Sequence, residues 1–339
     1  MIIRSKAPLR ISFGGGGTDV SPYAEEHGGF TLSATIDKYA YCTLTNLSDK
    51  TIKIYSLDYN STTSFLADEE LVFDGNLDLI KAAFKVFGVK EGLNLLIHSD
   101  MPPGSGLGAS STMTVAVVGA LKHYFNMPIE LYDVAETAYK IERKELGIKG
   151  GKQDQYAATF GNFNFTEFYG NKVIVNPLLI REDTRNELEY RLVLCYTGKT
   201  RLSAGIIDDQ VKRYINKEID TIKAFNETKQ LAVEMKNALL LNNIDEFGGL
   251  LNAAWKAKKR FTTKITDDHI DKLYDIGLKN GALGGKLLGA GGGGYLLFLC
   301  QYDKKHLVTS ALQKFGGEIT QFAFETKGLQ TWEIHDERK

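Results

Sequence analysis

Three glycine-rich stretches lie far apart in the sequence, each beside residues that can handle phosphate or a hydroxyl group. They are residues 10–19 (RISFGGGGTD), 102–111 (PPGSGLGASS) and 286–295 (KLLGAGGGGY). Glycine permits backbone conformations closed to other residues and lets the chain approach a ligand closely. Loops spread from the N-terminus to the C-terminal third predict one cleft assembled from both ends of the chain. The chemistry they favour together is phosphoryl transfer.

The middle stretch has the pattern of a phosphate-binding loop that opens a helix. Pro102 and Pro103 end an expected strand, glycines build the loop, and Ser110 and Ser111 stand where a helix begins. Free backbone N–H groups and the positive end of the helix dipole then face the loop and favour phosphate. No Gly-Lys-Ser/Thr follows, so the loop is not a Walker A loop. Taken alone, a tight turn with a serine helix cap explains it equally well.

Two carboxylates follow this loop in the sequence. Glu142 lies near the end of an expected helix, and Asp154 emerges from a glycine turn flanked by Lys149 and Lys152. Mg²⁺ at phosphoryl-transfer sites takes one or two carboxylates together with phosphates and water. A second carboxylate beside the acceptor hydroxyl can accept its proton or hold it in line. Glu142 by itself also fits a solvated helix residue, whereas Asp154 is harder to explain that way.

Other catalytic classes lack their signatures. The sequence has no His-Arg-Asp loop or Asp-Phe-Gly of protein kinases and no Gly-x-Ser-x-Gly elbow of serine hydrolases. No histidine pair has metal-ligand spacing, which argues against a transition-metal site.

Composition indicates a cytoplasmic enzyme. The chain has 339 residues and a formal net charge of −1, which gives no support for a nucleic-acid or anionic-membrane surface. No apolar run reaches transmembrane length, and the N-terminus does not resemble a secretory signal. Cys42, Cys195 and Cys300 are dispersed, which favours buried free thiols in a reducing compartment. The sequence leaves the oligomeric state open, with a homodimer as one possibility.

The sequence predicts a mixture of helices and strands to position these residues. It also predicts one domain over 1–185 and a second over 186–339. Alternation and apolar runs predict strands, and helical spacing predicts helices. The expected strands are 40–45, 51–55, 93–98, 191–196, 295–300 and a final one over 319–334. The expected helices are 77–87, 110–125, 129–146, a group over 203–280 interrupted near 242 and 262, and 304–315.

At this point the motifs resemble those of a known family, the GHMP small-molecule kinases. Residues 102–111 resemble the family's phosphate-binding motif, 7–10 (APLR) its N-terminal motif and 286–294 its C-terminal motif, in the family's order. The resemblance implies an α+β fold, with an N-terminal domain like ribosomal protein S5 domain 2 and a ferredoxin-like C-terminal domain. It also implies that ATP lies in the cleft between them.

The resemblance further implies roles for individual residues. Asp154 matches the catalytic aspartate, and Arg10 takes the place of a basic residue near the reacting hydroxyl, where a cation stabilises developing charge. Glu142 matches the magnesium-binding glutamate, with Ser110 or Ser111 as the hydroxyl ligand. The expected ATP-binding residues are Pro103, Gly104, Ser105, Gly106, Leu107, Gly108, Ala109, Ser110 and Ser111. Gly291 and Gly292 are expected to approach the substrate.

The first glycine stretch narrows the substrate. Residues 8–19 and 196–203 resemble the members of this family that phosphorylate the anomeric hydroxyl of D-glycero-D-manno-heptose 7-phosphate, on the route to GDP-heptose for bacterial surface polysaccharides. Gly17, Thr18 and Asp19 are then expected to bind the sugar. Lys199 and Arg201 are the candidates for its phosphate, since cations and N–H donors bind such a group.

Two alternatives stay open. One is a sugar-1-kinase of the same family for fucose, galactose or a uronic acid. The other is a sugar and ATP sensor without catalysis, because a scaffold can be kept for binding alone. The presence of both Glu142 and Asp154 favours catalysis, since binding would not require that pairing.

Overall fold

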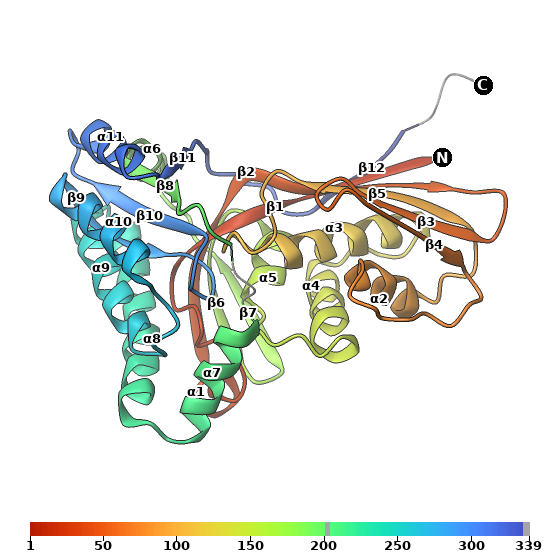
Figure 1. The fold of residues 1–339 in the computed structure, drawn as a ribbon, viewed down its shortest axis with the longest axis horizontal. Coiled ribbons are helices and arrows are strands. Elements are labelled where there is room, and N and C mark those ends of the chain that lie inside the picture. The colour runs from red at the N-terminus through yellow and green to blue at the C-terminus, as the bar shows by residue number, and fades with distance from the viewer. Residues whose placement is uncertain (201–203, 335–339) are drawn as a thin grey trace.

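The computed structural model describes residues 1–200 and 204–334 (Figure 1). The strands are β1 (Ile2–Gly14), β2 (Gly29–Asn46), β3 (Thr51–Ser56), β4 (Ser61–Leu66), β5 (Leu93–Ser99), β6 (Phe163–Tyr169), β7 (Lys172–Pro177), β8 (Leu192–Tyr196), β9 (Ala282–Leu287), β10 (Tyr295–Cys300), β11 (Glu318–Thr320) and β12 (Gln330–Ile334). The helices are α1 (Tyr23–His27), α2 (Asp78–Phe87), α3 (Ala109–Tyr124), α4 (Leu131–Lys140), the π-helix η1 (Ile141–Glu145), α5 (Gln153–Phe160), α6 (Glu182–Arg191), α7 (Ala204–Ile215), α8 (Ile219–Leu240), α9 (Ile244–Lys259), α10 (Asp268–Lys279) and α11 (Lys305–Lys314).

The first sheet is organised by one long strand. β2 pairs with β5 along residues 40–46 and with β6 along residues 29–34, so the sheet follows the order β12-β1-β2-β5-β3-β4 with β6 and β7 beside the other half of β2. Helices α2 to α5 lie against one face of this sheet (Figure 1). The helix α3 is apolar on nearly all sides and is buried from Ser111 to Lys122, because the sheet and the other helices enclose it.

The second sheet has the order β11-β8-β10-β9 and is antiparallel throughout. Along the chain its strands run β8, β9, β10, β11, with α7 to α10 after the first and α11 after the third. This succession and strand order are those of a ferredoxin-like unit. The expected α+β fold with an N-terminal and a ferredoxin-like C-terminal part is therefore confirmed.

Two predicted elements differ from the structure. The expected helix over 129–146 changes from α to π geometry at Ile141, where η1 begins. The expected last strand over 319–334 is wrong as one element: β11 completes the second sheet, while β12 pairs with β1 in the first. The reason is packing, because Leu329, just before β12, lies against Gly119 of α3. The boundary at 185 falls inside α6 and stays a prediction.

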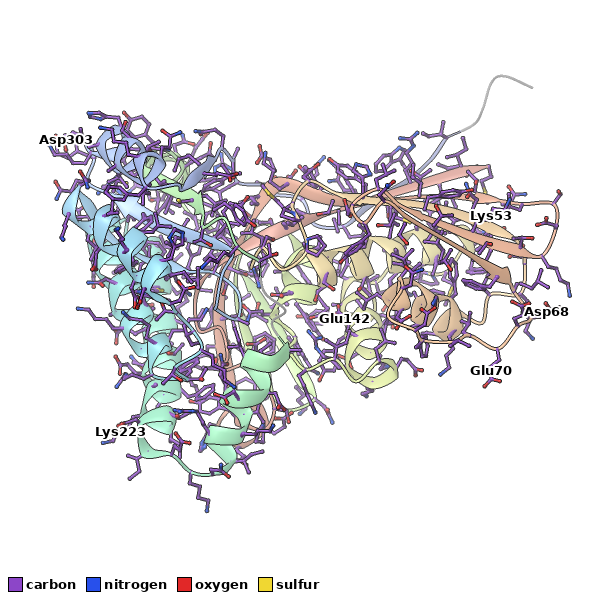
Figure 2. All side chains as sticks on the ribbon, viewed as in Figure 1. Lys53, Asp68, Glu70, Glu142, Lys223 and Asp303 are labelled. Carbon is purple, nitrogen blue, oxygen red and sulfur yellow. The ribbon has the colours of Figure 1, made fainter. Side chains whose placement is uncertain are left out.

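Three smaller observations bear on the sequence analysis. All three cysteines are buried and free, as expected. None of the helices in the described parts of the chain is long and apolar enough to cross a membrane. Charged side chains such as Lys53, Asp68 and Lys223 lie at the periphery, whereas Glu142 lies in the interior between the two halves (Figure 2).

The return of β12 to the first sheet generates a stability prediction. Ending the chain after Gly328 removes Leu329 and the five paired residues of β12. We expect the free energy of unfolding to fall by about 2 kcal/mol, because the truncation removes the partly buried Leu329 and uncovers the apolar surface of α3 beneath it. Urea unfolding of this truncation measures the loss, and a chain ending after Ile334 is the control. Equal stability of the two would mean that β12 contributes nothing.

Candidate active site

A cleft of about 170 Å³ lies where the three glycine stretches converge between the two halves. The C-terminal stretch touches the middle one directly: a methyl group on Gly289 would lie 2.5 Å from the Gly106 Cα, and the Tyr295 N–H donates to the Ser105 carbonyl at 3.1 Å. The first stretch joins them through Arg10, whose N–H donates to the Leu107 carbonyl at 3.1 Å. The predicted cleft built from both ends of the chain is therefore present.

An arginine–aspartate pair lies at the centre of this cleft. Arg10 comes from β1 and Asp154 from the first turn of α5, and Arg10 donates from Nε to the Asp154 Oδ1 at 2.8 Å, with Nη2 at 2.5 Å from the same oxygen. The remaining nitrogen, Nη1, donates to the Gly106 carbonyl at 2.7 Å. The Arg10 side chain is only 3% exposed and that of Asp154 is 23% exposed. The carboxylate therefore faces the cleft from a fixed position.

Beside it, Glu142 and Ser111 form an oxygen pair. Ser111 Oγ donates to Glu142 Oε2 at 2.9 Å, and Gln155 Nε2 donates to Ser111 Oγ at 3.1 Å and to Glu142 Oε1 at 3.0 Å. Among residues 1–200 and 204–334, the buried Gln155 Oε1 has no hydrogen-bond partner. Burial raises the pKa of Glu142, an effect that the nearby Arg143 opposes.

These oxygens fit a hard cation. Neighbouring ligands of an octahedral Mg²⁺, at bond lengths near 2.0–2.1 Å, lie roughly 2.9 Å apart. The Ser111 and Glu142 oxygens have this separation, and a desolvated carboxylate gains most from a cation that replaces its lost hydration. Ser111 is buried beside Glu142, whereas Ser110 is exposed at the cleft surface. Of the two serines that the sequence left open, the geometry therefore favours Ser111 as the ligand.

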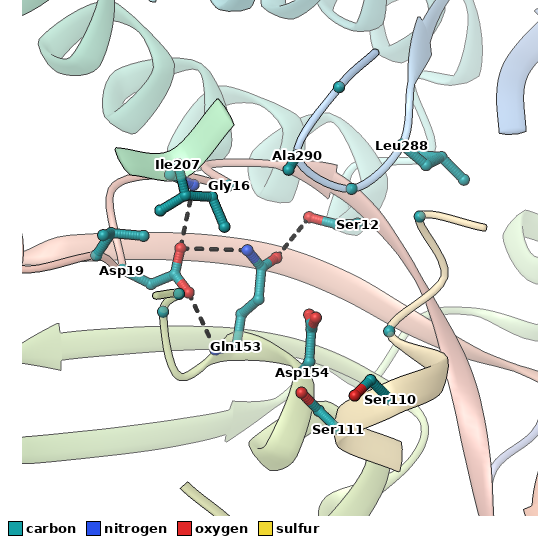
Figure 3. Close-up of a pocket in the computed structure, with 18 of the residues that line it drawn as sticks. Ser12, Gly16, Asp19, Ser110, Ser111, Gln153, Asp154, Ile207, Leu288 and Ala290 are labelled. Carbon is teal, nitrogen blue, oxygen red and sulfur yellow. Dashed lines mark hydrogen bonds between the residues drawn. The ribbon is translucent and has the colours of Figure 1, made fainter. Parts of the chain in front are cut away.

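A third group of polar side chains continues the cleft away from this pair. Asp19 accepts hydrogen bonds from the Gly17 and Gln153 backbone N–H groups at 3.1 and 3.0 Å and from Gln153 Nε2 at 3.2 Å. Gln153 Oε1 accepts from Ser12 Oγ at 2.9 Å, so the three side chains form one chain across the cleft (Figure 3). Burial raises the pKa of Asp19. Such a set of fixed acceptors and donors can hold sugar hydroxyls.

Two buried lysines hold the C-terminal glycine loop. Lys286 Nζ crosses to the first sheet and donates to the carbonyls of Ser12 and Phe13 at 3.0 and 2.9 Å. Lys258 Nζ donates to the Leu287 carbonyl at 3.2 Å and to the Gly289 carbonyl. Burial, reinforced by repulsion from Arg10, lowers the pKa of Lys258 to about 7, and burial with repulsion from other cations lowers the pKa of Lys286 well below its usual range.

The structure brings most of the predicted site residues to one cleft. Those lining it are Arg10, Gly17, Asp19, Gly104, Gly106, Gly108, Ala109, Ser110, Ser111, Glu142, Asp154 and Gly291. Those that do not line it are Thr18, Pro103, Ser105, Leu107, Lys199 and Gly292. The Thr18 hydroxyl donates to the carbonyls of Gly15 and Phe30 and so fixes the first glycine turn. The Gly292 N–H donates to the Ile265 carbonyl. Arg201 lies outside the described residues.

Lys199, a candidate for binding the substrate phosphate, does not line the cleft. Its side chain is 51% exposed and its ammonium lies 3.4 Å from the Asp267 carboxylate, outside the cleft lining. Its carbonyl instead accepts the Gly294 N–H at 2.8 Å and so supports the glycine loop from behind. A role for Lys199 in binding substrate stays a prediction that this contact does not favour.

Sequence reasoning missed several cleft residues. Ser12, Arg143, Gln153 and Lys258 line the cleft, and Gln155 is buried behind Glu142 and Ser111. Gln153 and Gln155 flank Asp154, and alternate neighbours of a catalytic residue in the first turn of a helix are a usable signal. Lys258 stands among exposed cations, but it lies three residues after the buried Trp255 on the same helix face.

Comparison with known proteins agrees with this fold, which is that of a small-molecule kinase. The model of the GHMP kinases N terminal domain matches residues 77–162, and that of the GHMP kinases C terminal domain matches residues 235–318. The chain is 41% identical to D-glycero-alpha-D-manno-heptose 7-phosphate kinase of Campylobacter jejuni, over 98% of this chain and 99% of that protein.

Solved structures give the same result. A crystal structure described as a D-glycero-D-manno-heptose 1-phosphate kinase from Bacteriodes thetaiotaomicron has a TM-score of 0.83 and 35% identity, over 98% of this chain and 100% of that one. A putative sugar kinase from Campylobacter jejuni has a TM-score of 0.80 and 38% identity, over 98% of both chains. The chain therefore belongs to the GHMP kinase family. It is a phosphotransferase.

The depressed pKa of Lys258 predicts a pH dependence of stability. An unfolded lysine titrates near 10.4, while the folded value is about 7. Between these values the unfolded chain binds the extra proton, so the free energy of unfolding rises with pH. From pH 7 to 9 this contribution is roughly 2 kcal/mol. Lys258→Met removes it, so chemical unfolding of parent and variant at several pH values must show diverging curves. Parallel curves would show that Lys258 keeps an ordinary pKa.

The oxygen pair generates a prediction that separates the two serines. Ser111→Ala removes a cation ligand, and we expect the Mg²⁺ concentration for half-maximal turnover to rise about tenfold, the scale of 1–2 kcal/mol for a lost ligand contact. Ser110→Ala, one residue away and exposed, is the matched variant and should change this concentration less. Mg²⁺ titrations of turnover measure both. The reverse ranking would give the ligand role to Ser110.

Proposed function

We propose that this chain is an ATP-dependent sugar kinase that phosphorylates the anomeric C1 hydroxyl of D-glycero-D-manno-heptose 7-phosphate. The product would be the 1,7-bisphosphate, a precursor of GDP-heptose for surface polysaccharide. The observation that carries the proposal is the position of the Arg10–Asp154 pair. It lies between the Ser111–Glu142 oxygens on one side and the Asp19–Gln153–Ser12 chain on the other. The named heptose kinase relative supports the sugar.

In this proposal each half of the cleft binds one reactant. The N–H groups of the 104–111 loop and the first turn of α3 would bind the ATP phosphates. Glu142 and Ser111 would hold Mg²⁺, which neutralises phosphate charge when bound. Asp19 and Gln153 would hold sugar hydroxyls on the opposite side, with the reacting hydroxyl next to Asp154.

The Arg10–Asp154 pair then divides the chemical work. The Asp154 carboxylate accepts the hydroxyl proton or orients the hydroxyl in line with the γ-phosphorus. Arg10 fixes that carboxylate through two nitrogens and donates its third to the phosphate loop. Its charge also stabilises negative charge developing on the transferring group.

A sugar that already carries a phosphate needs a cation at the far end of its site. The chain offers Lys149, which lines the cleft and is exposed. Within residues 1–200 and 204–334 its ammonium has no ion-pair partner. Lys199 is less suited, since it pairs with Asp267 outside the lining. We therefore assign the 7-phosphate to Lys149, with Arg201 retained as a sequence-based candidate.

An ADP-release assay with Mg-ATP and a panel of sugars tests the function. We expect turnover with heptose 7-phosphate to exceed that with free heptose, fucose, galactose and uronic acids. A preference for fucose or galactose would assign another sugar-1-kinase of the family. Binding of both reactants without ADP release would identify a sensor.

The free buried thiols favour a cytoplasmic location for this enzyme.

The role of Asp154 predicts the effect of an isosteric change. Asp154→Asn keeps the size of the side chain but cannot accept the hydroxyl proton, so we expect turnover to fall roughly 10²–10⁴-fold. Nucleotide affinity, measured by calorimetry, should stay within a few fold because the phosphate loop is unchanged. Near-parental turnover would remove Asp154 from the chemistry.

The assignment of the 7-phosphate predicts a substrate-dependent loss. Lys149→Ala should lower kcat/KM for heptose 7-phosphate about tenfold, the scale of one charged hydrogen bond, and leave that for free heptose nearly unchanged. Lys199→Ala is the matched control, with little effect on either sugar. Equal losses for both sugars would show that Lys149 does not read the phosphate, and a selective loss in Lys199→Ala would return that role to Lys199.

A further inference from the structure

Arg143 occupies a position between the two halves of the cleft that the proposed chemistry does not use. It follows Glu142 directly in the π-helix η1, and such helices often occur at functional sites. Its side chain lines the cleft and is only 13% exposed. A buried guanidinium requires several acceptors, so its partners indicate its function.

One partner belongs to the metal half of the cleft. Arg143 Nη1 lies 3.2 Å from Glu142 Oε2, the oxygen that also accepts from Ser111. In the absence of a cation, this ion pair offsets part of the desolvation of Glu142.

The other partners belong to the loop between η1 and α5. Arg143 donates to the Ile148 carbonyl at 3.4 Å and to the Gly151 carbonyl at 3.3 and 3.4 Å. These contacts are long compared with the usual 2.9–3.0 Å for N–H···O bonds, so they have room to shorten. A methyl group on Gly150 would lie 2.5 Å from Arg143 Nη2, which shows how closely the guanidinium approaches this backbone.

The same loop shapes the sugar half of the cleft. A methyl group on Gly151 would lie 1.9 Å from the Asp19 Oδ2, so only glycine fits between Arg143 and Asp19. Two residues further on, the Gln153 N–H donates to that same carboxylate oxygen at 3.0 Å. The position of this backbone therefore decides where Asp19 and Gln153 present their polar atoms.

From these contacts we infer that Arg143 is a positioning residue that couples binding at Glu142 to binding of the sugar. A cation bound to Glu142 would neutralise the negative charge of this carboxylate and repel the guanidinium of Arg143. Arg143 then shifts its donors toward the Ile148 and Gly151 carbonyls and fixes the loop against Asp19. Mg-nucleotide and sugar thus bind with positive coupling, which acts in both directions. This inference rests on the proposed function, since it takes the ligands to be a Mg-nucleotide and a sugar.

Calorimetry of sugar binding, with and without a saturating non-hydrolysable Mg-ATP analogue, tests the coupling without relying on turnover. The probe is heptose 7-phosphate. We expect the analogue to tighten its binding by about tenfold in the parent, within the usual range of such couplings. In Arg143→Gln the tightening should fall below about threefold, with sugar affinity in the absence of nucleotide little changed. Arg143→Lys keeps the charge but not the fork of donors, and should retain only part of the coupling.

Lys144→Gln is the matched control, since it removes an exposed positive charge from the next residue of the same π-helix. It should keep the parental coupling. Equal coupling in the parent and Arg143→Gln, or no coupling in the parent, overturns the inference. Failure of the parent to bind the sugar or the nucleotide at all overturns the proposed function instead, so the two failures are distinguishable. Melting temperatures of all variants, measured in parallel, show whether each is folded.

Discussion

The buried ion pair between Arg10 and Asp154 is the interaction on which the rest of the site depends. Arg10 is nearly inaccessible to water, and leaving a buried charge unpaired is strongly destabilising. The structure satisfies it with the Asp154 carboxylate and the Gly106 carbonyl, and so ties β1, the phosphate loop and the start of α5 to one point. In the proposed function, the same geometry would also set the distance between nucleotide and acceptor.

Two further basic side chains, Lys258 and Lys286, are buried near Arg10 and also need hydrogen-bond acceptors. The positive charge of Arg10 helps to lower the pKa of both lysines. Backbone carbonyls next to the C-terminal glycine loop accept hydrogen bonds from Lys258, and carbonyls of β1 accept them from Lys286. When protonated, these two lysines together with Arg10 create a field that favours polyanionic ligands. The glycines allow the loops to approach each other closely enough for this arrangement, since a side chain on Gly289 would clash with Gly106.

Sequence predicted the parts of the molecule that local chemistry determines. The strands over 51–55 and 93–98, the helix over 110–125 and the convergence of the glycine stretches follow from periodicity, turn residues and motif spacing, and the structure confirms them, with the helix starting one residue earlier, at Ala109. The pairing of β12 with β1 could not be predicted, because it depends on contacts across the whole chain. The same holds for Arg143, whose partners depend on the path of a glycine-rich loop. The surroundings of Lys199 could not be predicted either, because a Gly-Lys-Thr-Arg turn has the same sequence whether its lysine faces a cleft or a neighbouring carboxylate such as Asp267.

The position of the transferred phosphate on the product tests the central claim most directly. The two heptose kinase relatives are described by different phosphates, 7-phosphate for one and 1-phosphate for the other, so the site of transfer needs its own measurement. Heptose 7-phosphate labelled with ¹³C at C1, incubated with enzyme and Mg-ATP, gives a product whose ³¹P–¹³C couplings identify the new ester. The proposed reaction predicts a second phosphorus resonance coupled to C1, with the original 7-phosphate retained. A new phosphate on any other carbon, or no new ester while ADP accumulates, would contradict it.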